Sequence, residues 1–266
     1  FMQSTCDIMF KFTEYVMYFA PMGIFGAISA TIGKNGIGIL INYAKLIGVT
    51  YLSLAVFVII TLVIVCKIIR IPFRGILRAI KEPALLAFST ASSEAALPKA
   101  MDAMEKFGVP KNIVSFVMPT GYTFNLDGST LYLTLTTLFC AQVAGIDLSF
   151  NQQILIMLTL MLTSKGVAGV PRVALVVLTG TLHTFGLPVE GVAILLGIDQ
   201  ILDMGRTTVN LVGNCVATTV VARWEDEFDY ERMNRFLDST DSKKKKPSLV
   251  STKNILADKT APPGNY

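Results

Sequence analysis

The chain has 266 residues, of which 52% are hydrophobic and 16% are charged, and its formal net charge at pH 7 is +4. Its mean hydropathy of +0.57 is well above the values of soluble domains of this length. The composition therefore excludes an ordinary soluble protein and predicts an integral membrane protein. The cysteines stand singly in apolar segments, so no metal site is predicted with certainty.

The first predicted helix covers residues 8–33 and bends near Pro21. The second, 45–66, contains the uncharged run from Leu46 to Cys66, which is as long as the roughly 20 residues that a helix needs to cross a bilayer. Basic residues gather directly after it, at Lys67, Arg70, Arg74, Arg78 and Lys81. By the positive-inside rule, this end of the span faces the cytoplasm.

Two later segments, 83–107 and 152–185, are too short and too broken to cross. The first has two apolar limbs of roughly 10 to 12 residues, and at about 1.5 Å per residue each limb reaches only halfway through the hydrocarbon. The second repeats this pattern around a glycine-rich tip. Both segments are therefore predicted to be re-entrant helical hairpins.

The two hairpins belong to a repeated unit. Their tips share a signature, Ala95–Lys99 (AALPK) against Ala168–Arg172 (AGVPR). Each hairpin is followed by one long apolar helix with a polar break, TFNLDGS within 112–144 and DMGRTTVN within 189–224. Lysines follow the first hairpin, whereas the loops flanking the second carry acids only, so we expect the two units to be inverted. Interrupted segments in inverted repeats indicate a secondary transporter with a binding site at the midplane.

The polar break TFNLDGS is a candidate cation site. Asn and Gly are poor helix formers, and unwound backbone at membrane depth is tolerated only where it is buried in protein or lines a cavity. Unwinding would free carbonyl groups, while Asp127 supplies a negative charge and Asn125 a neutral oxygen. The alternative is a simple kink with an interhelical hydrogen bond from Asn125. The charge of Asp127, which a kink does not need, favours the cation site.

Charged and amide side chains form a stripe on the last helix. At about 100° per residue they fall within an arc of roughly 80°, so we expect them to face the protein interior. They are Asp199, Asp203, Arg206, Asn210 and Asn214. Asp203 and Arg206 could form an ion pair that only holds the bundle together, but a buried pair is a weak source of stability. A guanidinium suits a carboxylate and Asp203 suits an ammonium, so the two together indicate an acidic amino acid as ligand.

The motifs SSEAALP, TFNLDGS, AGVP and DMGRTTVN resemble those of the glutamate/aspartate and dicarboxylate:cation symporters, over about residues 8–224. The resemblance implies an all-α membrane protein with transmembrane helices, two inverted re-entrant helical hairpins and broken helices. It also implies an elevator mechanism, in which a transport domain slides against a homotrimeric scaffold within the lipid bilayer. The family places further helices before residue 1, so we expect the N-terminal helices to be missing. No enzymatic activity and no nucleic-acid partner are expected.

This resemblance divides the chain into three parts. Residues 1–44 are predicted to be a scaffold-type transmembrane helix with an outer loop, and 225–266 a disordered cytoplasmic tail near anionic lipid. The transport domain, 45–224, comprises the span 45–66, the hairpin 83–107, the broken helix 112–144, the hairpin 152–185 and the binding helix 189–224. The predicted location is the cytoplasmic (inner) membrane, crossed several times.

Residue roles follow from the same resemblance. Arg206 resembles the residue that binds the substrate's side-chain carboxylate, and Asp203 the one that binds its amino group. The other expected substrate-binding residues are Thr207, Asn210, Ser129, Ser92 and Ser93, and the cation-coupling residues are Asn125, Asp127, Thr123, Asp199 and Asn214. Relatives for neutral amino acids usually lack the arginine and those for succinate usually lack the aspartate, so glutamate or aspartate is expected. Symport of a C4-dicarboxylate or of cystine is the alternative.

The chain departs from sodium-coupled members of the family. They usually have a carboxylate where this chain has Asn214 and a threonine where it has Val167. Lys165 also lies near the second tip, where its ammonium could occupy the space of a cation. These features resemble the proton-coupled bacterial branch, so H+ is the expected coupling ion, with Na+ as the alternative and no other cofactor. The candidate proton carriers are Asp199, Asp127 and Glu94.

Two other classes of function fit some of these residues. Asp127 and Asp203 could form the dyad of an intramembrane protease, but Arg206 one turn away would keep Asp203 ionised. Arg206 could also line a passive anion pore. Accumulation of substrate against its gradient separates a symporter from both.

Overall fold

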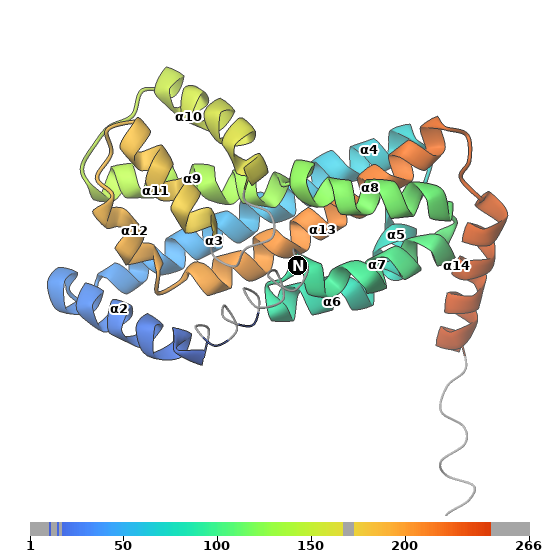
Figure 1. Cartoon of the computed structure of the whole chain (residues 1–266), viewed down its shortest axis with the longest axis horizontal. Helices are drawn as coiled ribbons and strands as arrows, with labels where there is room; N and C mark the ends of the chain where they lie inside the picture. Colours follow the sequence, from blue (N-terminus) through green and yellow to red (C-terminus); the bar gives the residue numbers. More distant parts are fainter. Residues whose placement is uncertain (1–10, 12–14, 16–17, 167–172, 246–266) are drawn as a thin grey trace, which may run out of the picture.

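The computed structural model describes residues 11, 15, 18–166 and 173–245, and every regular element in this part of the chain is a helix (Figure 1). The prediction of an all-α protein is therefore confirmed. The central element is α13 (Asp199–Trp224), which contacts helices of both halves of the bundle.

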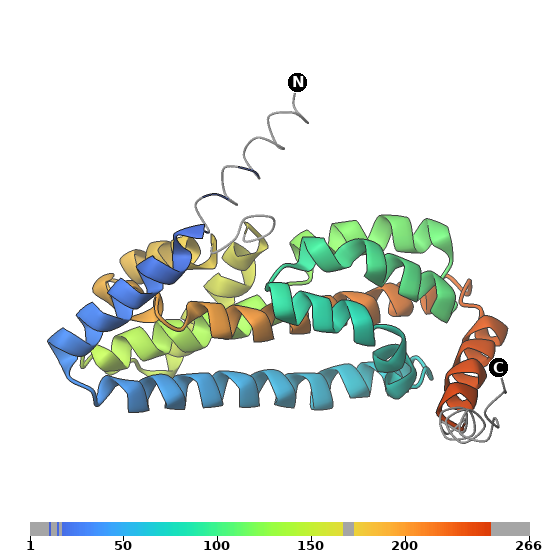
Figure 2. The ribbon, with the colours of Figure 1, turned by 90° about the horizontal axis from the view of Figure 1, so that it is seen from below.

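One long helix runs along one side of the bundle (Figure 2). It runs from α3 (Ile39–Phe57) through the π-turn Val58–Leu62 into α4 (Val63–Ile68). Among the described residues this is the one helix long and apolar enough to cross a bilayer, and only 22% of its most apolar window is buried. A large apolar surface is therefore left for contact with lipid or with other helices.

One N-terminal prediction needs correction. The span begins at Ile39 rather than at residue 45, because α2 (Ala20–Asn35) ends at Gly36 with a positive φ of 76° and the next helix starts three residues later. The predicted boundary between residues 44 and 45 therefore falls inside a helix. Pro21 lies in the first turn of α2, where its missing N–H costs no hydrogen bond, and most of the residues before this helix lie outside the described part of the chain.

The first half contains α5 (Phe73–Ala79), α6 (Lys81–Thr90), α7 (Ser93–Phe107), α8 (Lys111–Phe124) and α9 (Asp127–Val143). Helices α6 and α7 pack together and are joined by a turn at Ala91, which has a φ of 49°. The Ser92 hydroxyl caps α7 by accepting a hydrogen bond from the Ala95 N–H at 3.3 Å. The helix break within TFNLDGS lies at Asn125 and Leu126, between α8 and α9.

The second half contains α10 (Phe150–Thr163), the 3-10 turn Ser164–Gly166, α11 (Val173–Thr184) and α12 (Glu190–Leu195). Helices α10 and α11 contact each other, and Val167 and the predicted tip AGVP lie outside the described residues.

The predicted helix 189–224 is interrupted, but not at DMGRTTVN. Its break lies at residues 196–198, and the polar run is continuous helix within α13. The break contains Gly197, where a Cβ would lie 2.5 Å from Ile28 Cγ1 of α2. The polar run stays helical because its charged groups find partners within the helix, as described below.

Buried apolar side chains form two separate clusters, one around α5–α8 and one around α9–α12. Helix α13 belongs to both, since Leu202 lies in the second cluster and Leu211 and Cys215 lie in the first. The polar segment of α13 between Leu202 and Leu211 therefore lies at the junction of the two cores.

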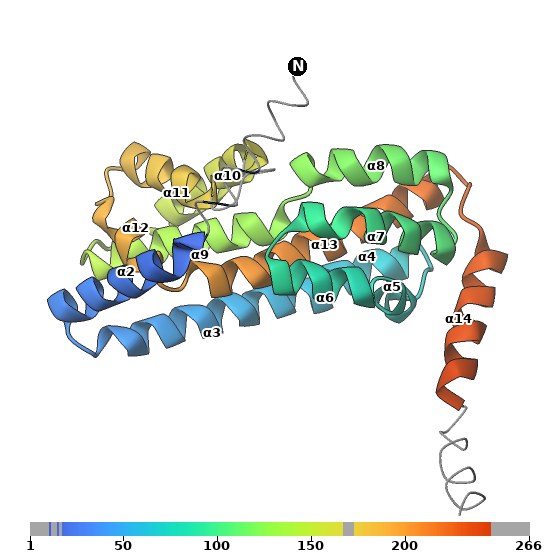
Figure 3. The ribbon, with the colours of Figure 1, turned by 60° about the horizontal axis from the view of Figure 1, so that its bottom comes forward.

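The predicted disorder of 225–266 is wrong for α14 (Tyr230–Lys245), which packs across the end of α7 (Figure 3). Phe107 at the end of α7 makes edge-to-face contacts with Phe228 and Phe236, with ring centroids 6.0 Å apart in both cases. Met233 is buried in the same cluster. Residues 246–266 lie outside the described part of the chain.

Candidate functional site

The candidate site is built where the break between α8 and α9 meets the polar segment of α13. The Asn210 side chain crosses this contact. Its Oδ1 accepts hydrogen bonds from the backbone N–H groups of Gly128 at 2.8 Å and Ser129 at 3.3 Å, and its Nδ2 donates to Ser129 Oγ at 2.9 Å. These bonds satisfy N–H groups that the first turn of a helix leaves without partners. Asn210 therefore fixes the start of α9 against α13.

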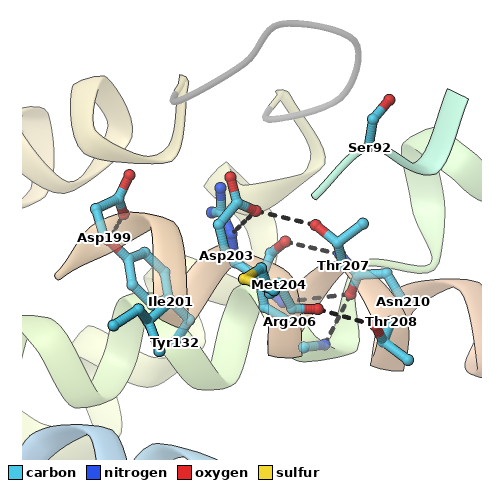
Figure 4. A network of polar contacts seen from close by, with 12 residues as sticks. Ser92, Tyr132, Asp199, Ile201, Asp203, Met204, Arg206, Thr207, Thr208 and Asn210 are labelled. Atoms are coloured by element: carbon cyan, nitrogen blue, oxygen red, sulfur yellow. Dashed lines mark hydrogen bonds and ion pairs between the residues drawn. The ribbon is translucent and has the colours of Figure 1, made fainter. Parts of the chain in front are cut away.

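The ion pair of α13 lies one turn before Asn210 (Figure 4). Arg206 Nε donates to Asp203 Oδ1 at 2.7 Å, and Thr207 Oγ1 donates to the same oxygen at 2.9 Å. Arg206 and Asp203 are 5% and 7% exposed. Both bonds fall on Oδ1, so Asp203 Oδ2 accepts no hydrogen bond from the described residues and is available to a donor of a ligand. Arg206 Nη1 is buried and has no hydrogen-bond partner among the described residues, so it is left to donate.

Tyr132 of α9 supports this pair from below. The Arg206 guanidinium lies over the Tyr132 ring, 4.8 Å from the ring centroid. The Tyr132 hydroxyl donates to Asp199 Oδ1 at 2.7 Å, and both side chains are fully buried. This stacking contact and hydrogen bond limit the rotamers of Arg206. Sequence reasoning does not single out Tyr132, because a tyrosine in an apolar helix is typical of a core residue.

A small cavity lies beside the break. It has a volume of about 10 Å³, which is room for one water-sized occupant. Asn214 Nδ2 donates to the Met118 carbonyl at 2.8 Å, while Asn214 Oδ1 is buried without a hydrogen-bond partner among the described residues. The lining residues are Ser93, Gly121, Tyr122, Asn125, Leu126, Asn210, Leu211 and Asn214.

The structure brings most of the predicted site residues to this junction. Those that lie together are Asp203, Arg206, Thr207, Asn210, Ser129, Asn125, Asp127 and Asn214, with Asp199 next to Tyr132. Ser93 reaches the junction through its carbonyl, which accepts a hydrogen bond from the Tyr122 hydroxyl. Ser92 lies apart from the ion pair, and its hydroxyl bonds within its own helix pair, to Glu94 and Ala95 (Figure 4). Thr123 is exposed on the last turn of α8.

Residues 1–224 match the sequence profile of the sodium:dicarboxylate symporter family. The chain belongs to this family. It is 50% identical over 237 residues to a proton/sodium-glutamate symport protein of Bacillus caldotenax, with 89% of this chain and 56% of the relative covered. It is 46% identical over 230 residues to a proton/glutamate-aspartate symporter of Escherichia coli (strain K12), with 86% and 53% covered.

A third relative, named C4-dicarboxylate transport protein, comes from Agrobacterium fabrum (strain C58 / ATCC 33970). It is 47% identical over 238 residues, with 89% of this chain and 53% of the relative covered. The chain thus spans about half the length of these curated relatives. Membership of a transporter family agrees with the apolar composition and with the membrane-length helix Ile39–Ile68.

Gly128 tests whether the close contact of α9 and α13 matters. A Cβ at this position would lie 2.5 Å from the Arg206 carbonyl oxygen, which belongs to a helix backbone and cannot rotate away. Gly128→Ala is expected to destabilise the protein by about 1–3 kcal/mol, as overpacking does. Thermal unfolding of the purified protein measures this effect. Gly180→Ala in α11, where a Cβ meets nothing within 4 Å, is the matched control, and equal unfolding midpoints for the two variants would contradict the prediction.

Proposed function

We propose that the protein is a secondary active transporter that carries L-glutamate and L-aspartate across the cytoplasmic membrane by symport with protons. One observation carries this proposal. Within the part of the chain that the structure describes, Arg206 Nη1 is a buried donor without a partner, and it lies beside Asp203, whose Oδ2 accepts no hydrogen bond, at the junction of two apolar cores. A ligand that has both a carboxylate and an ammonium satisfies both groups.

The rest of the site supports an amino acid with two carboxylates. In the proposed complex Arg206 binds the side-chain carboxylate and Asp203 the amino group. The main-chain carboxylate lies near Ser129 and Asn210 at the start of α9, where the positive end of the helix dipole favours an anion. Thr207 orients Asp203 through its hydrogen bond. Ser93, whose carbonyl reaches the junction, and Ser92 are the proposed contacts from the first hairpin.

The membrane arrangement is part of the same proposal. Helices α6–α7 and α10–α11 are the two inverted re-entrant hairpins, and residues 39–224 act as a transport domain that moves against a trimeric scaffold. The tail lies in the cytoplasm. The separate apolar cores of the two halves support the duplicated organisation.

Protons are the proposed coupling ion, with Na+ as the alternative. Sodium is held by oxygen ligands and is favoured by a nearby carboxylate. Here the small cavity is lined by the neutral amides of Asn214 and Asn125. Asp127, Thr123 and Asp199, the other proposed coupling residues, lie outside its lining. Without a carboxylate at this position, the remaining oxygens do not offset the cost of dehydrating a sodium ion.

Uptake of labelled glutamate by vesicles that contain the full-length protein tests this proposal. An inward proton gradient without sodium is expected to drive accumulation above equilibrium, and a proton ionophore is expected to collapse it. Asn214→Asp, which adds a carboxylate beside the cavity, is expected to introduce stimulation by sodium. Uptake by the unmutated protein that follows a sodium gradient and ignores the ionophore would overturn proton coupling. Equilibration without accumulation would indicate a pore.

A C4-dicarboxylate is the second candidate substrate, because relatives with 46% and 47% identity are named C4-dicarboxylate transport proteins. Such a substrate has no amino group to bind Asp203. Competition between glutamate and succinate for uptake separates the two candidates.

A further inference from the structure

Lys165 makes a long-range contact at the helix break that the proposed substrate site does not use. It lies in the 3-10 turn that follows α10, and its Nζ donates to the Phe124 carbonyl at 2.5 Å. Phe124 is the last residue of α8. The neighbouring Ser164 Oγ lies 3.0 Å from Thr130 Oγ1, in the first turn of α9. Two consecutive residues of the second half therefore hold both sides of the break.

The end of α8 needs a positive charge. The last carbonyls of a helix have no partners within the helix and form the negative end of its dipole. Asp127, in the first turn of α9 and three residues after Phe124, adds a carboxylate. Negative groups at membrane depth are costly unless a cation or donor compensates them. Lys165 supplies both a charge and a donor there.

We infer that the Lys165 ammonium is a tethered cation that takes the place of a dissolved metal ion at the end of α8. It holds the α10–α11 pair against the break in the state that binds substrate. A dissolved ion must be bound again in each transport cycle, whereas the Lys165 ammonium stays covalently attached to the protein throughout the cycle. Binding of substrate therefore does not depend on sodium at this position. This inference rests on the proposed transport function and concerns only how the site is held together.

Replacement of the amine tests the inference in the full-length protein. Lys165→Met keeps the length of the side chain and removes the charge. It is expected to weaken equilibrium binding of the transported ligand, L-glutamate or succinate, by about tenfold or more, the usual effect of losing one charge-assisted hydrogen bond. Added sodium or methylammonium is expected to restore the affinity, because either cation can occupy the vacated place. Lys165→Arg, which keeps a charge, is expected to bind without added cation.

A cysteine variant gives an independent readout. Lys165→Cys is expected to regain affinity after reaction with a reagent that attaches an aminoethyl group, but not after attachment of a neutral ethyl group. The unmutated protein treated in the same way is the control for the other cysteines. Lys99→Met removes an exposed amine that pairs with Glu82 at 2.6 Å, and it is expected to leave binding unchanged.

Three results would overturn the inference. They are unchanged affinity in Lys165→Met, a loss that neither sodium nor methylammonium reverses in a protein with a normal unfolding midpoint, and equal recovery with the neutral and the charged reagent. If Lys165→Met fails to fold, the comparison of Lys165→Arg with the unmutated protein decides, since a sodium requirement in the arginine variant also contradicts the inference. All these measurements are made at equilibrium. Failure of proton-driven uptake by the unmutated protein would overturn the proposed function instead.

Discussion

Arg206→Cys is expected to abolish binding and transport of acidic amino acids. The substitution removes the guanidinium that pairs with Asp203 at 2.7 Å and the buried donor Nη1 that has no partner among the described residues. Loss of a two-point contact to a carboxylate corresponds to about 3 kcal/mol or more, a weakening of over a hundredfold. The smaller, neutral side chain leaves room for small neutral amino acids. Uptake of labelled glutamate and of labelled serine, measured side by side, tests both expectations.

The matched control is Arg223→Cys near the end of the same helix. Arg223 forms an ion pair of the same spacing with Asp226, also at 2.7 Å, but the Asp226 side chain is 84% exposed. Loss of this exposed pair is expected to change neither transport nor stability measurably. Arg206→Cys leaves the buried Asp203 carboxylate without its partner, so its unfolding midpoint must be measured as well. The double variant Arg206→Cys with Asp203→Asn removes both charges, so no buried charge is left without its partner. Undiminished glutamate affinity in either variant would show that Arg206 does not bind the substrate carboxylate.

Asp203→Asn is expected to separate amino acids from dicarboxylates. A buried, charge-assisted hydrogen bond from an ammonium contributes about 1.5–3 kcal/mol, so glutamate affinity is expected to fall by more than tenfold. Succinate has no ammonium and is expected to lose much less. Competition of both ligands against labelled substrate measures the two effects in one experiment. Equal losses for the two ligands would mean that Asp203 acts only by orienting Arg206 and Thr207, and Asp226→Asn serves as the exposed control.

The stripe on α13 could be predicted because helical periodicity is a local property. Asp199, Asp203, Arg206, Asn210 and Asn214 are all buried, at 0%, 7%, 5%, 8% and 2% exposure, as their common face requires. The break within TFNLDGS could be found for a similar reason, since a carboxylate, an amide and a glycine within five residues disfavour a continuous apolar helix.

The second break shows the limit of such reasoning. Polarity alone indicated an interruption at DMGRTTVN, yet that segment is helical because Asp203 bonds to residues three and four positions later. Side chains that satisfy each other along one helix need no unwound backbone. The actual break contains Gly197, and a glycine, as a poor helix former, is the local feature that indicates an interruption there.

Other features depend on contacts between distant segments. The contact of Lys165 with Phe124 spans 41 positions, and the one between Tyr132 and Asp199 spans 67. Helix α14 has a polar composition typical of a solvated tail, and its order comes from Phe228 and Phe236 packing on Phe107. No local pattern predicts such partners. Residue roles that depend on such long-range contacts can be assigned only from the three-dimensional structure.

The packing of α14 makes the C-terminal region mechanically continuous with the site. Helix α7 runs without interruption from the turn at Ser92 to Phe107, 15 residues that span about 22 Å. Phe107 is clamped between Phe228 and Phe236, and the Asp229 N–H donates to the Gly108 carbonyl at 2.9 Å. A force applied to α14 is thus transmitted along α7 to the turn at Ser92, and Pro98, which lacks a backbone donor inside this helix, is the position where α7 yields most easily.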